Sequence, residues 1–409
     1  MPPLRALHAT LALLAFLCSA CSTMTDRCVT PTLAIIGATV YPSPTEAPIA
    51  DGVVLIHGDK IVAVGTAAAI SVCADVPTIR AQGQHLVAGF QNSHIHFTEP
   101  IWEGAASQPA AKLGEQLNDI ALRRGFTTVV DIGSHTANTV AMRARIERGE
   151  VVGPRILTTG IPFYPVNGIP WYLRDLPPEI LKMFNTPATP AEARALVAKQ
   201  VAEGADAVKL FTGSGMGQGK VLPMDTAIAT AAADEAHKLG KPVFSHASNL
   251  AGLEVAIAAR VDVIAHPLQD TDDWSPAVNA RMRERGMAMV PTLTLFGSVD
   301  NIAAIEREVG DYARAGGQIL FGTDGGFIPY RGTDEEFLRM GRAGLDWRAI
   351  LASLTTAPAA RFGESARRGR IAPGMDADLV LLSGDPSRDT GNFSNVRMTI
   401  RRGVIAFGR

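Results

Sequence analysis

The sequence of 409 residues predicts an α/β protein, with a (β/α)8 TIM barrel and a small β-sandwich built from both chain ends. Between residues 87 and 369, short apolar runs alternate with alanine-rich stretches of helical spacing, which is typical of repeated strand–helix units. Both ends contain short strands separated by turns instead. A chain of this length, 47% hydrophobic, is long enough for one large domain and one small one.

The central segment, residues 87–369, is expected to be the catalytic barrel. Its eight strand candidates are 87–96, 127–132, 155–159, 206–211, 242–246, 261–266, 287–292 and 318–324. Helices fit the intervals at 226–239, 250–260 and 347–354, and Asp346 is the expected N-cap of the last. A doubly wound sheet is the alternative, but eight units close more naturally into a barrel.

The two chain ends, residues 29–86 and 370–409, are predicted to combine into one β-sandwich domain. Two apolar runs joined by Gly58 and Asp59 predict a tight hairpin. Runs at 378–382, 396–401 and 403–407, with turns between them, continue the same pattern at the C-terminus. Together these runs predict a small β-domain beside the barrel.

Residues 1–21 resemble a bacterial lipoprotein signal peptide. Arg5 gives a positive start, residues 9–17 are apolar, and Cys21 follows small residues. The apolar run is too short to stay in a bilayer as a helix. We therefore expect an exported, periplasmic or outer-membrane-anchored lipoprotein with Cys21 lipidated, and ordinary cleavage after Ala20 is the alternative.

Two cysteines remain after this segment, Cys28 and Cys73. In an exported chain they could form a disulfide, and the alternative is two separate thiols. The formal net charge of -2 gives no basic surface for nucleic acid. Membrane contact is therefore expected only through the lipid anchor, and the sequence does not exclude a homo-oligomer.

The segment 161–189 interrupts the alternation and predicts a lid loop. It contains six prolines together with aromatic residues, among them Tyr164, Trp171 and Tyr172. Loops this long in compact domains are usually functional or disordered, and the aromatic residues favour a lid. These three side chains are therefore candidates for substrate contact.

Three further residues near strand ends are candidates for substrate contact. His135 follows the second strand, and capping a loop is its alternative role. Tyr330 and Arg331 follow the last strand, where Arg331 could bind a substrate carboxylate or remain solvated. The acidic run 334–336 is interpreted as the solvated start of a helix.

Two histidines at the end of the first predicted strand begin a metal-binding pattern. Strand side chains alternate, so His94 and His96 share a face. Such a pair alone is more often incidental than functional. Polar residues also end four other strands, and the C-terminal ends of barrel strands meet at one face. A shared metal site is therefore predicted from His94, His96, Lys209, His246, His266 and Asp324.

The order of these residues resembles the binuclear-metal branch of the amidohydrolase superfamily, in particular its imidazolonepropionase-like and prolidase-like metal-dependent hydrolases. One departure is Asn92, where such proteins usually carry an acid before the histidines. The resemblance covers nearly the whole chain after the signal, with matching segments at 125–131, 153–155, 204–209, 356–360 and 369–379.

The resemblance implies two divalent metal ions, with zinc as the default. His94, His96 and Asp324 would hold the more buried ion. His246 and His266 would hold the more exposed one, and Lys209, carboxylated by carbon dioxide, would bridge the two. An ion pair between Lys209 and Asp324 is the alternative. A metal-bridging hydroxide would attack an amide carbonyl, with Asp324 as the catalytic proton carrier.

The expected reaction is therefore hydrolysis of a C–N bond in a small amide or peptide, such as a dipeptide or an N-acyl amino acid, which includes dipeptidase activity. A mononuclear deaminase or cyclic-amide hydrolase, in which His266 is catalytic, is the first alternative. Its relatives lack the lysine of the fourth strand, so Lys209 argues against it. A lipoprotein that binds a ligand without turnover is the second alternative.

Overall fold

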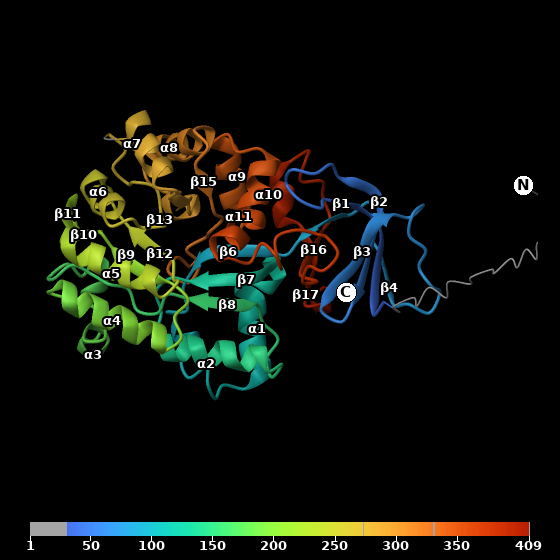
Figure 1. Cartoon of the computed structure of the whole chain (residues 1–409), viewed down its shortest axis with the longest axis horizontal. Helices are drawn as coiled ribbons and strands as arrows, with labels where there is room; N and C mark the ends of the chain where they lie inside the picture. Colours follow the sequence, from blue (N-terminus) through green and yellow to red (C-terminus); the bar gives the residue numbers. More distant parts are fainter. Residues whose placement is uncertain (1–30, 273, 330–331, 409) are drawn as a thin grey trace, which may run out of the picture. The chain divides into compact units, whose positions relative to one another are not determined.

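The computed structural model of the protein describes residues 31–272, 274–329 and 332–408. The described residues form one compact unit. Figure 1 shows two kinds of β-structure in this unit: a sheet built from the chain ends, and parallel strands flanked by helices between them. The predicted sites at Cys21, Cys28, Tyr330 and Arg331 lie outside the described residues.

The first sheet contains strands from both ends of the chain. Its strands are β1 (Leu33–Val40), β2 (Ile49–His57), β3 (Lys60–Thr66), β4 (Thr78–Arg80), β5 (His85–Ala88), β16 (Leu379–Leu382), β17 (Val396–Arg401) and β18 (Val404–Phe407). Their order is β18-β17-β16-β5-β1-β2-β3, with β4 paired to β1 beside this path. β5 joins the two ends, because it pairs with both β1 and β16.

The predicted hairpin is present between β2 and β3, where His57 pairs with Lys60. Gly58 has a φ of 59°, a conformation that favours glycine. A sandwich requires a second, facing sheet, whereas the eight described strands of the chain ends belong to one sheet. Alternate side chains give that sheet its own apolar core, which includes Ile35, Val54, Leu86, Leu379 and Ile400.

The central part contains all eight predicted parallel strands. They are β6 (Phe90–Ile95), β7 (Phe126–Asp131), β8 (Arg155–Thr158), β9 (Val208–Phe211), β12 (Val243–His246), β13 (Val263–Ala265), β14 (Ala288–Val290) and β15 (Gln318–Ile319). They pair as two parallel sheets, β6-β7-β8 and β15-β14-β13-β12-β9. This arrangement is a TIM-barrel-like α/β fold.

Backbone hydrogen bonds cross both gaps between the two parallel sheets. At one gap, Ser93 N donates to Phe321 O at 2.7 Å and Asp324 N donates to His94 O at 2.9 Å. At the other gap, Asp206 N donates to Thr158 O at 2.7 Å. Among the residues that the structure describes, no single ladder runs around all eight strands, so these isolated bonds replace the continuous pairing of a closed barrel.

Inward-facing side chains of the parallel strands form an apolar cluster of their own. It contains Ala207, Phe244, Ala265, Val290 and Leu320 from five neighbouring strands or the residues beside them. Polar residues replace this apolar packing toward the C-terminal strand ends, which is where TIM-barrel enzymes carry their sites.

Helices connect the parallel strands, as predicted. One of these helices, α10 (Trp347–Leu354), has the predicted bounds, and the Asp346 carboxylate accepts a hydrogen bond from Ala349 N at 2.9 Å. None of the described helices is long and apolar enough to cross a membrane. The others longer than four residues are α1 (Ala110–Ile120), α2 (Thr136–Glu147), α4 (Pro190–Ala202), α5 (Thr226–Lys238), α6 (Leu250–Ala258), α7 (Pro276–Glu284), α8 (Ile302–Arg314), α9 (Asp334–Arg342) and α11 (Thr356–Arg361).

The predicted lid, residues 161–189, contains two short helical turns, η3 (Trp171–Leu173) and α3 (Pro178–Leu181). Its first residues are attached to β9, because Phe163 N donates to Lys209 O and Phe211 N donates to Phe163 O, both at 2.8 Å. The lid therefore starts beside the strand that carries Lys209.

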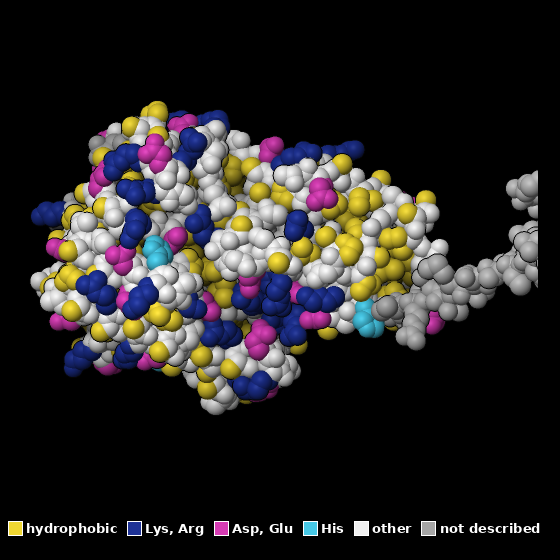
Figure 2. All heavy atoms as spheres, viewed as in Figure 1, with side chains coloured by type: hydrophobic (Ala, Val, Ile, Leu, Met, Phe, Trp, Pro, Cys, Tyr) yellow, Lys and Arg dark blue, Asp and Glu magenta, His cyan; other side chains and the backbone are white. Residues whose placement is uncertain are grey.

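The surface in Figure 2 carries basic and acidic side chains interspersed over the helices. Hydrophobic side chains gather on this face over the strands β1 to β3. Cys73 is exposed and makes no disulfide with any described residue.

Candidate metal centre

Asp324 and the two histidines of β6 meet at the end of that strand. Asp324 Oδ1 lies 3.1 Å from His94 Nε2 and 3.0 Å from His96 Nε2, and the two Nε2 atoms are 3.3 Å apart. Asp324 reaches this position because its backbone N–H donates to His94 O. Its φ of 56° lies in the left-handed region, which is uncommon for a residue with a side chain.

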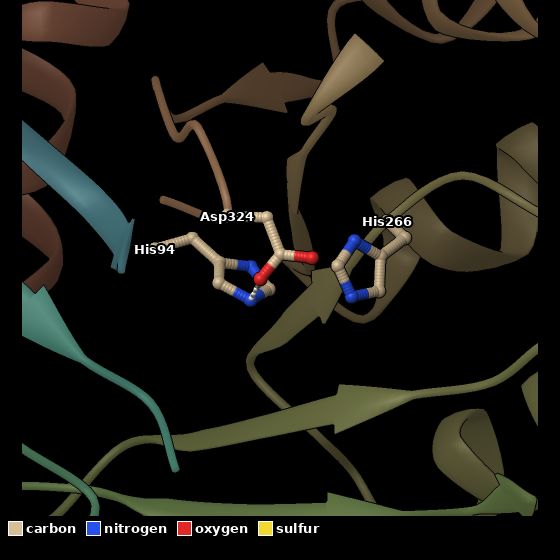
Figure 3. A group of neighbouring side chains, drawn as sticks. All are labelled: His94, His266 and Asp324. Carbon is tan, nitrogen blue, oxygen red and sulfur yellow. Dashed lines mark ion pairs between the residues drawn. The ribbon is translucent and has the colours of Figure 1, made fainter. Parts of the chain in front are cut away.

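His266 and His246 bring the ends of two further strands to the same place. Figure 3 shows the Asp324 carboxylate between the His94 and His266 imidazoles. Ligand atoms of these three residues lie within 4.8 Å of one another. The ring centroids of His266 and His246 are 5.0 Å apart, and those of His94 and His266 are 4.6 Å apart.

His266 departs from strand alternation. Its neighbour Ala265 belongs to the inner apolar cluster, so continued alternation would turn the next side chain outward, as it does for Ile264. The φ of 81° at His266 breaks the alternation. Backbone strain of this kind is often stored at functional sites.

Lys209 on β9 is also at this place and is only 2% exposed. Burial lowers its pKa to about 7, and the negative charge of Asp324 opposes this shift. Among the described residues, no ion pair joins Lys209 to Asp324, and Lys209 Nζ lies over the Phe211 ring, 5.6 Å from its centroid. The lysine amine therefore remains available to another partner.

The buried imidazoles are neutral and Asp324 is ionised. Burial lowers the pKa of His94 and of His246 to about 3, and it lowers the pKa of His266 well below its ordinary value. Burial alone would raise the pKa of Asp324, but His94 and His96 outweigh it and hold that pKa well below the usual range. Neutral imidazoles beside an anionic carboxylate are the protonation states that metal binding requires.

Neighbouring oxygen atoms decide which histidine nitrogen faces the site. Ser248 Oγ donates its single proton to Gly213 O at 2.9 Å, so it must accept from His246 Nε2, also at 2.9 Å. This leaves the lone pair of His246 on Nδ1. His96 Nδ1 lies 3.4 Å from Gly133 O, which can only accept, so the lone pair of His96 is on Nε2.

The Nδ1 atom of His266 is held by Thr292, at the end of β14. The distance from Nδ1 to Thr292 Oγ1 is 2.7 Å, and Thr292 is completely buried. Thr292 has a φ of 41°, a strained value for a β-branched residue. The Glu336 carboxylate supports this turn by accepting hydrogen bonds from Leu293 N at 2.9 Å and from Thr294 N and Oγ1 at 2.8 Å.

Glu336 corrects one interpretation of the sequence. The acidic run 334–336 does start a helix, α9, but Glu336 is fully buried rather than solvated. Helical spacing places it on the same face as Phe337 and Met340, which are also buried, so the pattern of that helix contained the signal. The roles of Thr292 and Ser248 were not predicted. The one signal for them in the sequence is that each residue lies just after a strand.

Asn92 does not contact the imidazole nitrogens of His94. Its Oδ1 accepts from His94 N at 3.1 Å, and its Nδ2 donates to Thr323 Oγ1 at 2.9 Å. His94 Nδ1 is buried without a hydrogen-bond partner. The amide at residue 92 therefore shapes the strand end and leaves His94 less firmly oriented than the other histidines.

The predicted substrate contacts lie in three different settings. His135 is exposed and caps α2, with its Nδ1 3.4 Å from Asn138 N, which matches its alternative role. Tyr164 is buried and its ring lies tilted against Phe211, which stacks on His246 with ring centroids 4.8 Å apart. Trp171 and Tyr172 are exposed in the lid.

The donor set fits a divalent metal ion. Ligand atoms about 2.0–2.1 Å from a tetrahedral zinc ion lie about 3.3 Å from one another. Asp324 Oδ1 and the Nε2 atoms of His94 and His96 are separated from one another by 3.0 to 3.3 Å. Asp324 Oδ1 is also buried without a hydrogen-bond partner, although buried oxygens of this kind normally have one. A cation would provide the missing interaction.

The chain is similar to known proteins in sequence pattern and in fold. A family model described as the amidohydrolase family matches residues 85–406. The fold is similar to that of a Xaa-Pro dipeptidase with bound methionine, with a TM-score of 0.77 and 22% identity over 91% of this chain and 99% of that chain. It is also similar to a putative prolidase from Bifidobacterium longum, with a TM-score of 0.75 and 24% identity over 92% and 94% of the two chains.

The ochratoxinase of A. niger is a third similar structure, with a TM-score of 0.76 and 21% identity over 92% of this chain and 95% of that chain. A comparison with curated proteins gave no match. Sequence identities at this level support similarity of fold alone, whereas membership of the amidohydrolase family rests on the match to the family model.

Proposed function

Because this chain belongs to the amidohydrolase family, we propose that it is a metal-dependent hydrolase that cleaves the C–N bond of a small amide, such as a dipeptide or an N-acyl amino acid. Family membership places the chain among hydrolases that act on carbon–nitrogen bonds. The observation that carries the proposal is the set of ligand atoms around Asp324 Oδ1.

The proposed ligands divide into two groups around Lys209. His94 and His96, through Nε2, and Asp324 would hold one ion. His246, through the Nδ1 atom that Ser248 leaves free, and His266, through Nε2, would hold the other. Lys209 would join the two ions as a carbamate, because reaction of its amine with carbon dioxide supplies anionic oxygen where an ammonium group is unfavourable.

Divalent ions at this site would lower the pKa of a water nucleophile and polarise the substrate carbonyl. Asp324 would accept the proton of that water and pass it to the leaving nitrogen. His96, His246 and His266 keep their orientation because Gly133, Ser248 and Thr292 hold their outer nitrogens. The surrounding burial excludes bulk water from the carboxylate, which is 2% exposed.

A mononuclear centre is the second candidate, and one observation favours it. The three residues His94, His266 and Asp324 lie close enough together to share a single ion. His266 would then be a ligand and not the catalytic residue of the mononuclear relatives, and the reaction would be deamination or hydrolysis of a cyclic amide. Metal analysis separates the two candidates, because the binuclear site predicts two ions per chain and the mononuclear site one.

Metal analysis and hydrolysis on the same preparation test the proposal. Protein loaded with zinc is screened against Xaa-Pro and Xaa-Arg dipeptides and N-acyl amino acids, before and after EDTA treatment. We expect hydrolysis that EDTA abolishes and added zinc restores. No hydrolysis of any amide by a chain that holds two ions would reject the proposal.

We also propose that the protein is exported and anchored by a lipid on Cys21, from the sequence of residues 1–21. Expression in a Gram-negative host tests this proposal. Membrane-fraction protein that becomes soluble in a Cys21→Ala variant supports the lipid anchor, and wild-type protein that is fully soluble contradicts it.

A further inference from the structure

Three exposed aromatic side chains lie together beside the metal centre. Among the described residues, the large aromatic side chains that are exposed are Trp171, Tyr172 and Phe327, at 58%, 36% and 47%. The other described aromatic rings are buried or half-buried. Exposed apolar groups that cluster, rather than occur singly, mark binding surfaces.

The three rings form a continuous row that begins at a proposed metal ligand. The Phe327 ring lies 6.3 Å from the His96 ring, the Tyr172 ring 5.4 Å from Phe327, and the Trp171 ring 5.8 Å from Tyr172. The last two contacts are edge-to-face, an arrangement that aromatic pairs favour. The row therefore leads from the reaction site toward the surface.

Backbone contacts fix Phe327 next to the metal centre. Gly326, with a φ of 95°, packs so tightly on His96 that an added Cβ would lie 2.0 Å from His96 O. The N–H of Phe327 donates to Asp324 O at 3.1 Å. The position of the Phe327 ring is thus tied to the same two residues that begin the site.

The lid end of the row is attached to the hairpin that follows Lys209, β10 (Gly213–Gly217) and β11 (Lys220–Pro223). Arg174, the residue after η3, donates from Nε to Ile169 O at 3.2 Å and contacts Met216 Sδ at 3.5 Å. An added Cβ at Gly217 would lie 3.6 Å from Trp171.

We propose that Phe327, Tyr172 and Trp171 form a subsite for an aromatic or bulky apolar substituent of the amide substrate. This inference rests on the hydrolase function proposed above and specifies its substrate class. A ring bound on this row would remove three exposed aromatic surfaces from water next to the scissile bond. Small dipeptides of glycine or alanine would leave the row uncovered and would be poor substrates.

A matched series of amides tests the subsite on the full, zinc-loaded chain. The acyl group is varied from acetyl to 2-naphthoyl with a fixed amino acid, and the amine from glycine to phenylalanine with a fixed acyl group. We expect at least one aromatic member to exceed its small counterpart roughly tenfold in kcat/KM, as apolar contacts in a specificity site allow. Phe327→Ala and Trp171→Ala should remove that preference, so that kcat/KM for the aromatic member falls toward the value that the same variant shows for the small member.

Val404→Ala is the matched control, because Val404 is 68% exposed on β18 and belongs to the terminal sheet. It should leave the preference unchanged. Equal kcat/KM for aromatic and small members in wild type would overturn the subsite. Phe327→Ala and Trp171→Ala would also overturn the subsite if they lowered kcat/KM equally for the aromatic and the small member. The same holds if these variants changed the protein from an oligomer to a monomer and left the substrate preference unchanged.

A binding measurement separates this inference from the hydrolase proposal. Calorimetric titration of the zinc-loaded Asp324→Asn chain with the naphthoyl amide needs no turnover. Binding that Phe327→Ala removes supports the subsite even where wild type hydrolyses no member of the series. Binding of naphthoyl and acetyl amides with the same affinity rejects the subsite while leaving the hydrolase proposal intact.

Discussion

Replacement of Thr292 by valine should weaken metal binding while it preserves the shape of the site. Valine has nearly the volume of threonine and keeps the branched Cβ that already tolerates the φ of 41°. What disappears is the hydroxyl 2.7 Å from His266 Nδ1. His266 would then be free to rotate or to carry its proton on the nitrogen that should bind the metal.

The magnitude follows from burial. Thr292 is 0% and His266 7% exposed, so water cannot replace the lost partner. An unsatisfied buried polar group costs about 1–3 kcal/mol. Loss of a hydrogen bond that orients a metal-bound histidine typically weakens affinity about 10–100-fold, which is about 1.4–2.8 kcal/mol. The two estimates agree, so we expect a 10–100-fold weaker affinity for one of the two ions.

The assay compares Thr292→Val with Thr292→Ser. Zinc affinity is measured on metal-free protein by competition with a chromogenic chelator, and stability by urea unfolding. Serine keeps the hydroxyl and loses a buried methyl group, so it should lose stability, by about 1 kcal/mol, but little affinity. Wild-type affinity in Thr292→Val, or equally weak binding in both variants, would refute the role assigned to the hydroxyl.

Three other changes have defined outcomes. Asp324→Asn should retain bound metal in elemental analysis but lose nearly all hydrolysis, and rates like those of wild type would refute its role as proton carrier. For metal-free protein, the free energy of urea unfolding should fall by about 1.4 kcal/mol for each of His94 and His246 when the pH is lowered from about 7.5 to about 5.5. The reason is that an unfolded histidine gains a proton below its ordinary pKa of 6.5, whereas these two stay neutral in the folded chain down to about pH 3. An unfolding free energy that does not change over this pH range would contradict their burial as neutral groups. Asp346→Ala should lower the free energy of unfolding by about 1 kcal/mol because α10 loses its N-cap, whereas Asp346→Asn should keep most of the capping energy. An unchanged unfolding midpoint in the alanine variant would exclude a stabilising cap.

Much of the fold was predictable because its signals are local. The eight parallel strands appear as apolar runs, and the cap of α10 needs only Asp346 before an amphipathic stretch. Pairing between strands depends on backbone from distant parts of the sequence, and in this respect the structure differs from the predicted closed barrel. The lid is inserted between β8 and β9, where Phe163 bonds to Lys209 and Phe211, and the two parallel sheets are separate there.

The candidate ligands were predictable because each is a polar residue at the end of an apolar strand. The orientation of His266 was not, since alternation would send it outward and only the left-handed backbone redirects it. The supporting residues were also hidden from sequence. Thr292 and Ser248 are small and uncharged, and Glu336 stands in an acidic run whose first member, Asp334, is exposed.

The sheet that unites both chain termini has a consequence for biosynthesis. β5 ends two residues before β6, the strand with His94, and one of its two pairing partners is β16, close to the end of the chain. A growing polypeptide therefore cannot complete the support under the strand that carries His94 until β16 has been synthesised. If the proposed function holds, metal capture should follow the synthesis of β16, and a variant that lacks β16 to β18 should take up less metal, although these strands contain none of the proposed ligands.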